Sequence, residues 1–141
     1  MLALTGALAA AEKPNFTGTW KLNADKSDYG GRPGGPAVTV KVDHQEPAFT
    51  SHVTVHRDGD PIVQEFKAKT DGKVYYDTYG PQSCTMKWEG DVILMEMFDG
   101  AGNLLNSNRI RLEKTGKVMF REGVIKTGGG DVKIREVWEK Q

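Results

Sequence analysis

The stretch Asn15-Phe16-Thr17-Gly18-Thr19-Trp20-Lys21-Leu22 decides the fold that we expect for this chain. Every second residue from Phe16 to Leu22 falls on one face of an extended strand, and the polar residues between them fall on the other. Gly18 leaves room for a close backbone or ring approach, and the large indole of Trp20 fills the space beside it. The stretch therefore predicts the first strand of a closed barrel, with Gly18 and Trp20 plugging one end.

Nine further segments show strand-like patterns, and turn residues such as Asp-Gly or Gly-Gly separate them. They span residues 37–45, 48–56, 62–70, 74–79, 82–88, 92–98, 104–112, 118–126 and 132–138. The connection from Asn23 to Pro36 is rich in glycine and proline and has room for at most one helical turn. We expect an all-β fold, a single antiparallel up-and-down β-barrel of about ten strands, because closure removes exposed strand edges.

Composition limits the classes of partner. The 141 residues are enough for one domain that buries roughly two thirds of its unfolded surface. Nineteen basic residues balance nineteen acidic ones, so no net field attracts nucleic acid or an anionic membrane. The chain is also too polar for a transmembrane segment. We assign residues 12–141 to the single β-barrel domain.

Residues 1–11 form a separate segment, small and apolar, which ends in Ala-x-Ala patterns before polar sequence begins. The pattern is typical of the hydrophobic region and cleavage site of a secretory signal peptide, here a truncated remnant without its basic start. On this interpretation the mature protein is periplasmic or secreted. The alternative is a short N-terminal helix or a disordered tail.

Four short motifs resemble the fatty-acid-binding proteins, which belong to the calycin group together with lipocalins and avidins. They are the opening Phe16 to Leu22, Gln64-Glu65-Phe66, Lys87-Trp88-Glu89-Gly90 and the closing Val137-Trp138-Glu139-Lys140. The chain is more similar still to a group of exported bacterial lipocalin-like proteins, through the opening motif and Lys26-Ser27-Asp28. The resemblance implies a barrel that holds a small hydrophobic or amphipathic molecule in its interior.

Two departures from the fatty-acid-binding pattern bear on function. The connection from Asn23 to Pro36 is too short for the helical lid of that family. Its carboxylate-binding Arg-x-Tyr on the last strand corresponds here to Glu136-Val137-Trp138, and Ile110 lies near the place of the second arginine. An inward Glu136 would repel a fatty-acid carboxylate.

Inward-facing positions of the predicted strands give the candidate ligand-binding residues. Methionines among aromatic residues make an adaptable apolar wall, although side chains can also simply fill a small barrel. The candidates are Val40, Phe49, Gln64, Phe66, Tyr76, Met86, Phe98, Ile110, Phe120, Glu122, Glu136 and Trp138.

Glu122 and Glu136 offer the clearest candidate chemistry, because adjacent buried carboxylates raise each other's pKa and can act as an acid/base pair. The alternative is that one glutamate points outward and pairs with Arg121 or Arg135. No serine lies in a nucleophile-elbow motif, and no phosphate-binding loop or Cys/His cluster appears in the sequence. Cys84 is the only cysteine and is expected to be a small buried residue.

The favoured hypothesis is thus an exported barrel that binds a small, largely hydrophobic ligand, without catalytic residues, cofactor or metal. A filled barrel that serves as a protein-interaction or envelope module is the first alternative. An enzyme that uses the interior glutamate pair is the second.

Overall fold

The computed structural model describes residues 13–32 and 34–141. Within these residues the chain has no helix and forms one sheet of ten antiparallel strands, which confirms the expected all-β fold. The strands are β1 (Gly18–Asp28), β2 (Val38–Gln45), β3 (Ala48–Val55), β4 (Ile62–Lys69), β5 (Tyr75–Tyr76), β6 (Ser83–Glu89), β7 (Val92–Phe98), β8 (Leu104–Leu112), β9 (Val118–Thr127) and β10 (Gly130–Lys140). None of the described residues belongs to a helix that could cross a membrane. The segment 1–11, interpreted above as a signal peptide remnant, lies outside the described residues.

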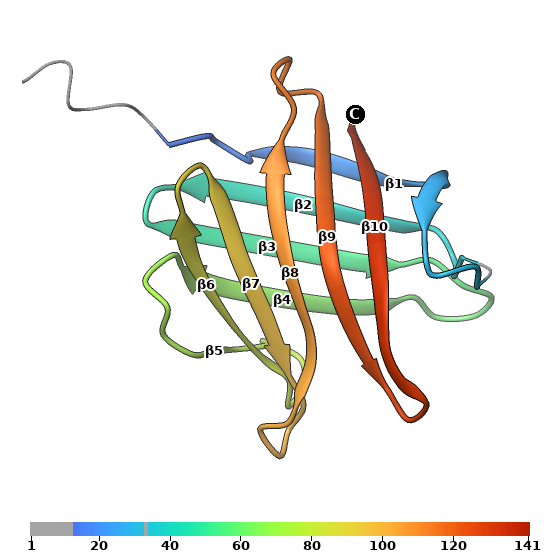
Figure 1. Cartoon of the computed structure of the whole chain (residues 1–141). Coiled ribbons are helices and arrows are strands. Elements are labelled where there is room, and N and C mark those ends of the chain that lie inside the picture. The colour runs from blue at the N-terminus through green and yellow to red at the C-terminus, as the bar shows by residue number, and fades with distance from the viewer. Residues whose placement is uncertain (1–12, 33) are drawn as a thin grey trace, which may run out of the picture.

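The strands follow one another in up-and-down order, and the sheet bends round into a nearly closed barrel (Figure 1). β1 pairs with both β2 and β10, so the first and last strands lie side by side. In Figure 1, β1 to β4 pass behind β6 to β10 at a steep angle. The barrel closes between β4 and the segment after β5, where the Thr78 N–H donates to the Glu65 carbonyl at 2.8 Å.

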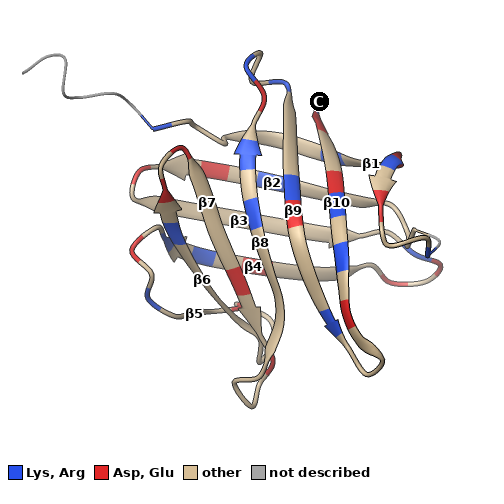
Figure 2. Cartoon of the chain, in the orientation of Figure 1, with Lys and Arg blue, Asp and Glu red and all other residues tan. Residues whose placement is uncertain are grey.

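Charged residues of both signs are interspersed along the strands and turns (Figure 2). Successive side chains of a strand point to opposite faces of the sheet. Every second residue therefore faces solvent and is mostly polar, while the residues between them face the interior. β10 shows the alternation up to Glu136, because Ile134 and Glu136 are buried while Lys133 and Arg135 are exposed. Val137 and Trp138 after it are both buried. The outer surface thus carries most of the charge, and Glu136 is an exception.

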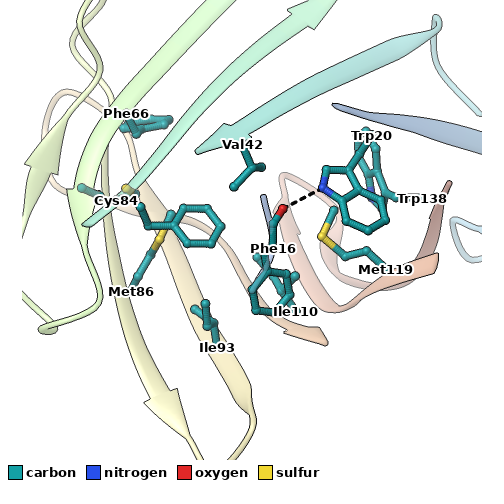
Figure 3. Packing of buried hydrophobic residues seen from close by; sticks show 12 residues of the cluster. Phe16, Trp20, Val42, Phe66, Cys84, Met86, Ile93, Ile110, Met119 and Trp138 are labelled. Carbon is teal, nitrogen blue, oxygen red and sulfur yellow. Dashed lines mark hydrogen bonds between the residues drawn. The ribbon is translucent and has the colours of Figure 1, made fainter. Parts of the chain in front are cut away.

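Buried apolar side chains form one cluster inside the barrel (Figure 3). Phe16 and Trp20 belong to this cluster, and both are fully buried. Trp20 Nε1 donates a hydrogen bond to the carbonyl of Phe16 at 2.9 Å, which holds the segment before β1 against the core. A Cβ at Gly18 would lie 2.7 Å from Cε of Lys140, so this glycine makes room for the last lysine of β10.

The first connection differs from the sequence-based expectation. A loop is predicted from Asn23 to Pro36, but β1 continues to Asp28, which pairs with Arg135 after a register shift. Ser27 explains the shift, because its hydroxyl donates to the Asn23 carbonyl at 2.7 Å and accepts the N–H of Val137 at 3.0 Å. A side-chain oxygen thus replaces a backbone partner at this bulge.

The strand predicted at residues 74–79 is reduced to Tyr75–Tyr76. Asp77 ends it, because its Oδ1 accepts the N–H groups of Glu65 at 2.9 Å and Tyr79 at 3.0 Å. Side-chain bonds of this kind compete with the sheet ladder and turn the chain.

Candidate functional site

The barrel contains a cavity of about 450 Å³ that is partly open to solvent, so side chains do not fill its interior. The wall is mostly apolar, with valines from β2 and β3 and aromatic rings from β3, β4 and β10. Four methionines from β6, β7 and β9 also line it, namely Met86, Met95, Met97 and Met119. Thioether side chains are flexible and polarizable, so this wall can adapt to apolar molecules of different shape.

Eight of the twelve predicted ligand-binding residues line this cavity. They come from six different strands and meet only because the barrel closes. These residues are Val40, Phe49, Gln64, Phe66, Met86, Ile110, Glu136 and Trp138. Their part in binding remains a prediction.

The expectation that Phe120 and Glu122 face the interior is wrong, because β9 alternates in the opposite phase. The register of β9 and β10 places Arg121 opposite Glu136. Directly opposed residues project from the same face of a sheet. Arg121 therefore follows Glu136 into the barrel, while its neighbours Phe120 and Glu122 lie outside. The interior pair of Glu122 and Glu136 does not form.

On the outer face, Phe120 lies between two guanidinium groups. The Cζ of Arg111 is 4.3 Å from the ring centroid and that of Arg135 is 4.9 Å. Glu122 forms an ion pair with each of them, at 3.4 Å from Arg111 and 3.6 Å from Arg135. Cation–π contacts and ion pairs thus accommodate an aromatic ring that hydrophobicity alone would place inside.

Tyr76 and Phe98 are the other two predicted residues that do not line the cavity. Tyr76 is 69% exposed, because its neighbour Tyr75 takes the inward position and packs against the core. On β7, Met97 lines the cavity and its neighbour Phe98 does not. The register between β7 and β8 shifts between these two residues.

Arg121 and Glu136 form an ion pair in the cavity wall that the sequence did not predict. Arg121 Nη1 donates to Glu136 Oε1 at 2.9 Å, and the two side chains are 18% and 8% exposed. Oε1 also accepts from Trp138 Nε1 at 3.3 Å, and Oε2 accepts from the Tyr29 hydroxyl at 2.8 Å. Three donors therefore surround the carboxylate, as a charge taken out of water requires.

Tyr29 reaches this ion pair from the connection after β1. Its burial and the negative charge of Glu136 raise the pKa of the Tyr29 hydroxyl well above its ordinary value of 10.0. The hydroxyl therefore keeps its proton and serves as a donor. The glycine-rich sequence around Tyr29 carries no alternation that could have predicted an inward position.

Two asparagines of β8 continue the polar group along the wall. Asn106 Oδ1 accepts from Arg121 Nη2 at 3.1 Å and from Asn108 Nδ2 at 2.9 Å. Asn108 is fully buried and lies opposite Gly123. A Cβ at Gly123 would come within 2.7 Å of Asn108 Oδ1, so the glycine makes room for this network.

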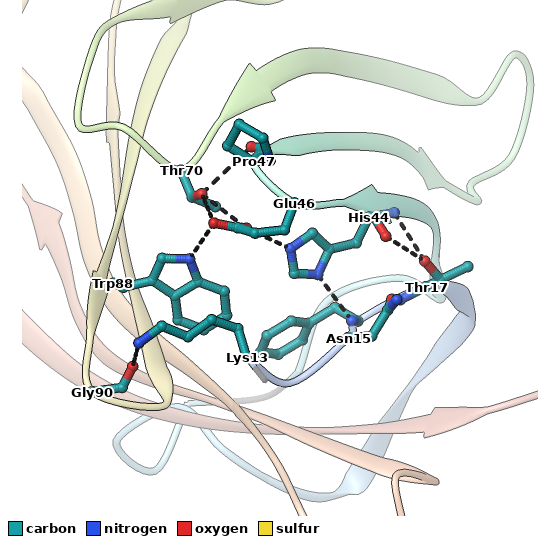
Figure 4. Close-up of polar contacts among 10 residues, drawn as sticks. Lys13, Asn15, Thr17, His44, Glu46, Pro47, Thr70, Trp88 and Gly90 are labelled. Atoms are coloured by element: carbon teal, nitrogen blue, oxygen red, sulfur yellow. Dashed lines mark hydrogen bonds and ion pairs between the residues drawn. The ribbon is translucent and has the colours of Figure 1, made fainter. Parts of the chain in front are cut away.

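A second polar cluster surrounds His44 and Glu46 (Figure 4). His44 is only 2% exposed, and its Nδ1 accepts the N–H of Phe16 at 3.1 Å. Its other nitrogen then carries the proton and donates to Glu46 Oε1 at 3.0 Å. Trp88 Nε1 donates to Glu46 Oε2 at 2.9 Å, and the Thr70 hydroxyl bonds the same carboxylate. Because both ring nitrogens of His44 and both carboxylate oxygens of Glu46 already have partners, this cluster has a structural role.

The described part of the chain shows neither a metal-binding cluster nor a reactive cysteine. No group of three His, Cys, Asp or Glu side chains there is placed to hold a metal ion. Cys84 is fully buried, and this burial raises the pKa of its thiol to about 12. Few molecules carry the reactive thiolate under such conditions.

Comparison with known proteins gives no relative from which a role could be transferred. No protein-family model, curated protein or solved structure matches the chain. The ten-stranded barrel is compatible with a calycin-like fold. The function must therefore be inferred from the chemistry of the cavity.

Proposed function

We propose that the protein is an exported, calycin-like barrel that binds a small, largely hydrophobic molecule in its interior, without changing it chemically. The observation that carries the proposal is the cavity of about 450 Å³ inside the barrel. Ligand pockets typically measure about 300–1,000 Å³ and have apolar walls with a few polar groups. The cavity meets both criteria.

The lining supports a ligand that is apolar over most of its surface. Asn106, Arg121 and Glu136 form a polar group in the wall, and valine, phenylalanine and methionine side chains form most of the rest. The other polar residues of the wall are Ser51, Gln64 and Gln82. Transfer of apolar surface from water into such a cavity contributes about 25 cal/mol per Å². An amphipathic molecule would place its polar end near Arg121 and its chain among the methionines.

The two alternative functions have less support. An acid/base pair of Glu122 and Glu136 requires both carboxylates in one place, but they lie on opposite faces of the β9–β10 hairpin. A filled barrel serving as an interaction module does not account for the cavity. The proposal of export depends on the apolar sequence of residues 1–11 alone.

Native mass spectrometry of the protein isolated from its host tests the proposal. We expect an additional mass from a small molecule, which is lost on denaturation. Val53→Phe places a ring into the cavity and should abolish this mass. Thr54→Phe adds the same ring one residue away on the other face of β3 and should leave it unchanged. Equal ligand retention by both variants would contradict binding in the interior.

A further inference from the structure

Around Arg121, the polar part of the cavity wall has hydrogen-bond donors to spare and few free acceptors. Glu136 Oε1 accepts from Arg121 and Trp138, and Oε2 accepts from Tyr29. Asn106 Oδ1 likewise accepts from two donors, Arg121 and Asn108. These three oxygens already have partners, so they offer little to a donor on a ligand.

Arg121 supplies the unused donors. A guanidinium group has five N–H bonds, and within the described residues Arg121 uses one to Glu136 and one to Asn106. Nε is buried and has no partner among these residues, and Arg121 is one of the residues that line the cavity. Nη1 and Nη2 each use one N–H in these bonds and keep a second one. Because a donor without an acceptor costs free energy in an apolar wall, an oxygen atom that enters the cavity beside Arg121 gains a ready partner.

Charge limits the kind of oxygen that fits. The positive charge of Arg121 is matched by Glu136 at 2.9 Å, so the pair carries no net charge. A carboxylate ligand would be attracted to Arg121 but repelled by Glu136, and it would lose its hydration on entry. A cationic ligand would find the oxygens of Glu136 already occupied by three donors.

Resting on the ligand-binding function proposed above, we infer that the ligand is an uncharged amphipath. Its head is a neutral hydrogen-bond acceptor, such as a ketone, ester or amide carbonyl, held by the unused N–H bonds of Arg121. The apolar tail lies among the methionines. Glu136 sets this preference as a positioning residue, because it neutralises Arg121 and holds its side chain in the wall.

Four probes with similar alkyl chains test the preference in the intact protein. They are methyl nonyl ketone, decanamide, decanoate and decylamine, each titrated at neutral pH below its solubility limit or critical micelle concentration. We expect the ketone and the amide to bind at least about tenfold more tightly than the two ions, a ratio of dissociation constants that calorimetry resolves easily. Decanoate or decylamine binding as tightly as the ketone would overturn the inference and leave the ligand-binding function standing. Failure of all four probes to bind would overturn both.

Glu136→Gln should reverse the preference. The substitution leaves Arg121 without a carboxylate partner, so decanoate should bind at least about tenfold more tightly than to the wild type and overtake the ketone. Glu122→Gln removes the same charge from the outer face of the same hairpin and should leave the order of the four probes unchanged. An unchanged order in Glu136→Gln would contradict the assigned role. If that variant does not fold, the wild-type series still decides the question.

The carbonyl stretching frequency of the bound ketone gives an independent readout. A hydrogen bond from Arg121 should lower this frequency relative to the ketone dissolved in a hydrocarbon. The same frequency in both environments would show that the head does not reach Arg121 and would overturn the inference.

Discussion

Arg121 and Glu136 oppose each other on β9 and β10 and pair at 2.9 Å inside a barrel whose wall is otherwise mostly apolar. Their neighbours Glu122 and Arg135 oppose each other on the outer face of the same two strands, at 3.6 Å. One hairpin therefore carries two pairs of the same chemical type, one shielded from water and one exposed. Because both pairs join an arginine to a glutamate, a comparison of the two separates the effect of burial on stability from the effect of charge.

The buried pair should contribute far more to stability than the exposed one. Removing one partner of a buried ion pair leaves an uncompensated charge, so Glu136→Gln should lower the free energy of unfolding by about 3 kcal/mol. Glu122→Gln should lower it by less than about 1 kcal/mol, because water screens exposed pairs. Urea unfolding of both variants measures the difference, and equal losses would contradict the placement of Glu136.

Gly123 should be the least replaceable of the glycines in the β9–β10 hairpin. A Cβ at this position would lie 2.0 Å from the carbonyl oxygen of Ser107 and 2.7 Å from Cα of Asn108, so strands β8 and β9 would have to separate. We expect Gly123→Ala to cost about 3 kcal/mol or more. Gly129→Ala in the turn, where the nearest atom is 4.0 Å away, should change stability by less than about 1 kcal/mol. Thermal unfolding of the two variants distinguishes these expectations.

Acid should weaken the cluster around Glu46. Burial disfavours the charged form, but hydrogen bonds from His44, Trp88 and Thr70 outweigh it and lower the pKa of Glu46 below its ordinary value of 4.5. A carboxyl group whose pKa is lowered by folding contributes stability above its unfolded pKa and loses it as pH falls. The contribution of Glu46 is thus fully present at neutral pH and declines below about pH 4.5.

Glu46→Gln isolates this contribution. Because the Glu46 side chain is 41% exposed, we expect a loss of only about 1 kcal/mol at neutral pH. The difference in the free energy of unfolding between the variant and the wild type should become smaller as the pH is lowered through 4.5. Denaturant unfolding across this range measures it, and a difference that stays constant with pH would contradict the expectation.

Cys84 should be unreactive in the folded protein. Its side chain is fully buried, and its pKa is raised to about 12 by that burial. A thiol reagent such as dithionitrobenzoate should therefore label Cys84 at the rate of unfolding rather than by direct attack. Labelling at a rate that does not change when denaturant accelerates unfolding would show that the thiol is accessible.

The strands could be predicted from the sequence because alternation and turn residues agree over most of the chain. Where the prediction was wrong, side chains had replaced backbone partners. Ser27 extends β1 past a bulge, and Asp77 shortens β5. Such bonds depend on strands distant in the sequence, so no local pattern indicates them.

The candidate site was predicted in part. The main error concerned β9, where the residues expected to face the interior face outward and their neighbours face inward. Hydrophobicity favours an inward Phe120, but Arg111 and Arg135 cover this ring outside. The turn held a usable signal, because pairing Thr127 with Gly130 across Gly128-Gly129 brings Arg121 opposite Glu136. Tyr29 had no such signal, since its position depends on the register shift in β1.

Binding in the interior is the central claim, and nuclear Overhauser effects between a bound ligand and the protein test it most directly. With saturating methyl nonyl ketone, we predict contacts from the nonyl chain to the methyl groups of Met86, Met95, Met97 and Met119, all of which line the cavity. Contacts confined to exposed residues such as Tyr76, with none to these methyl groups, would contradict the account.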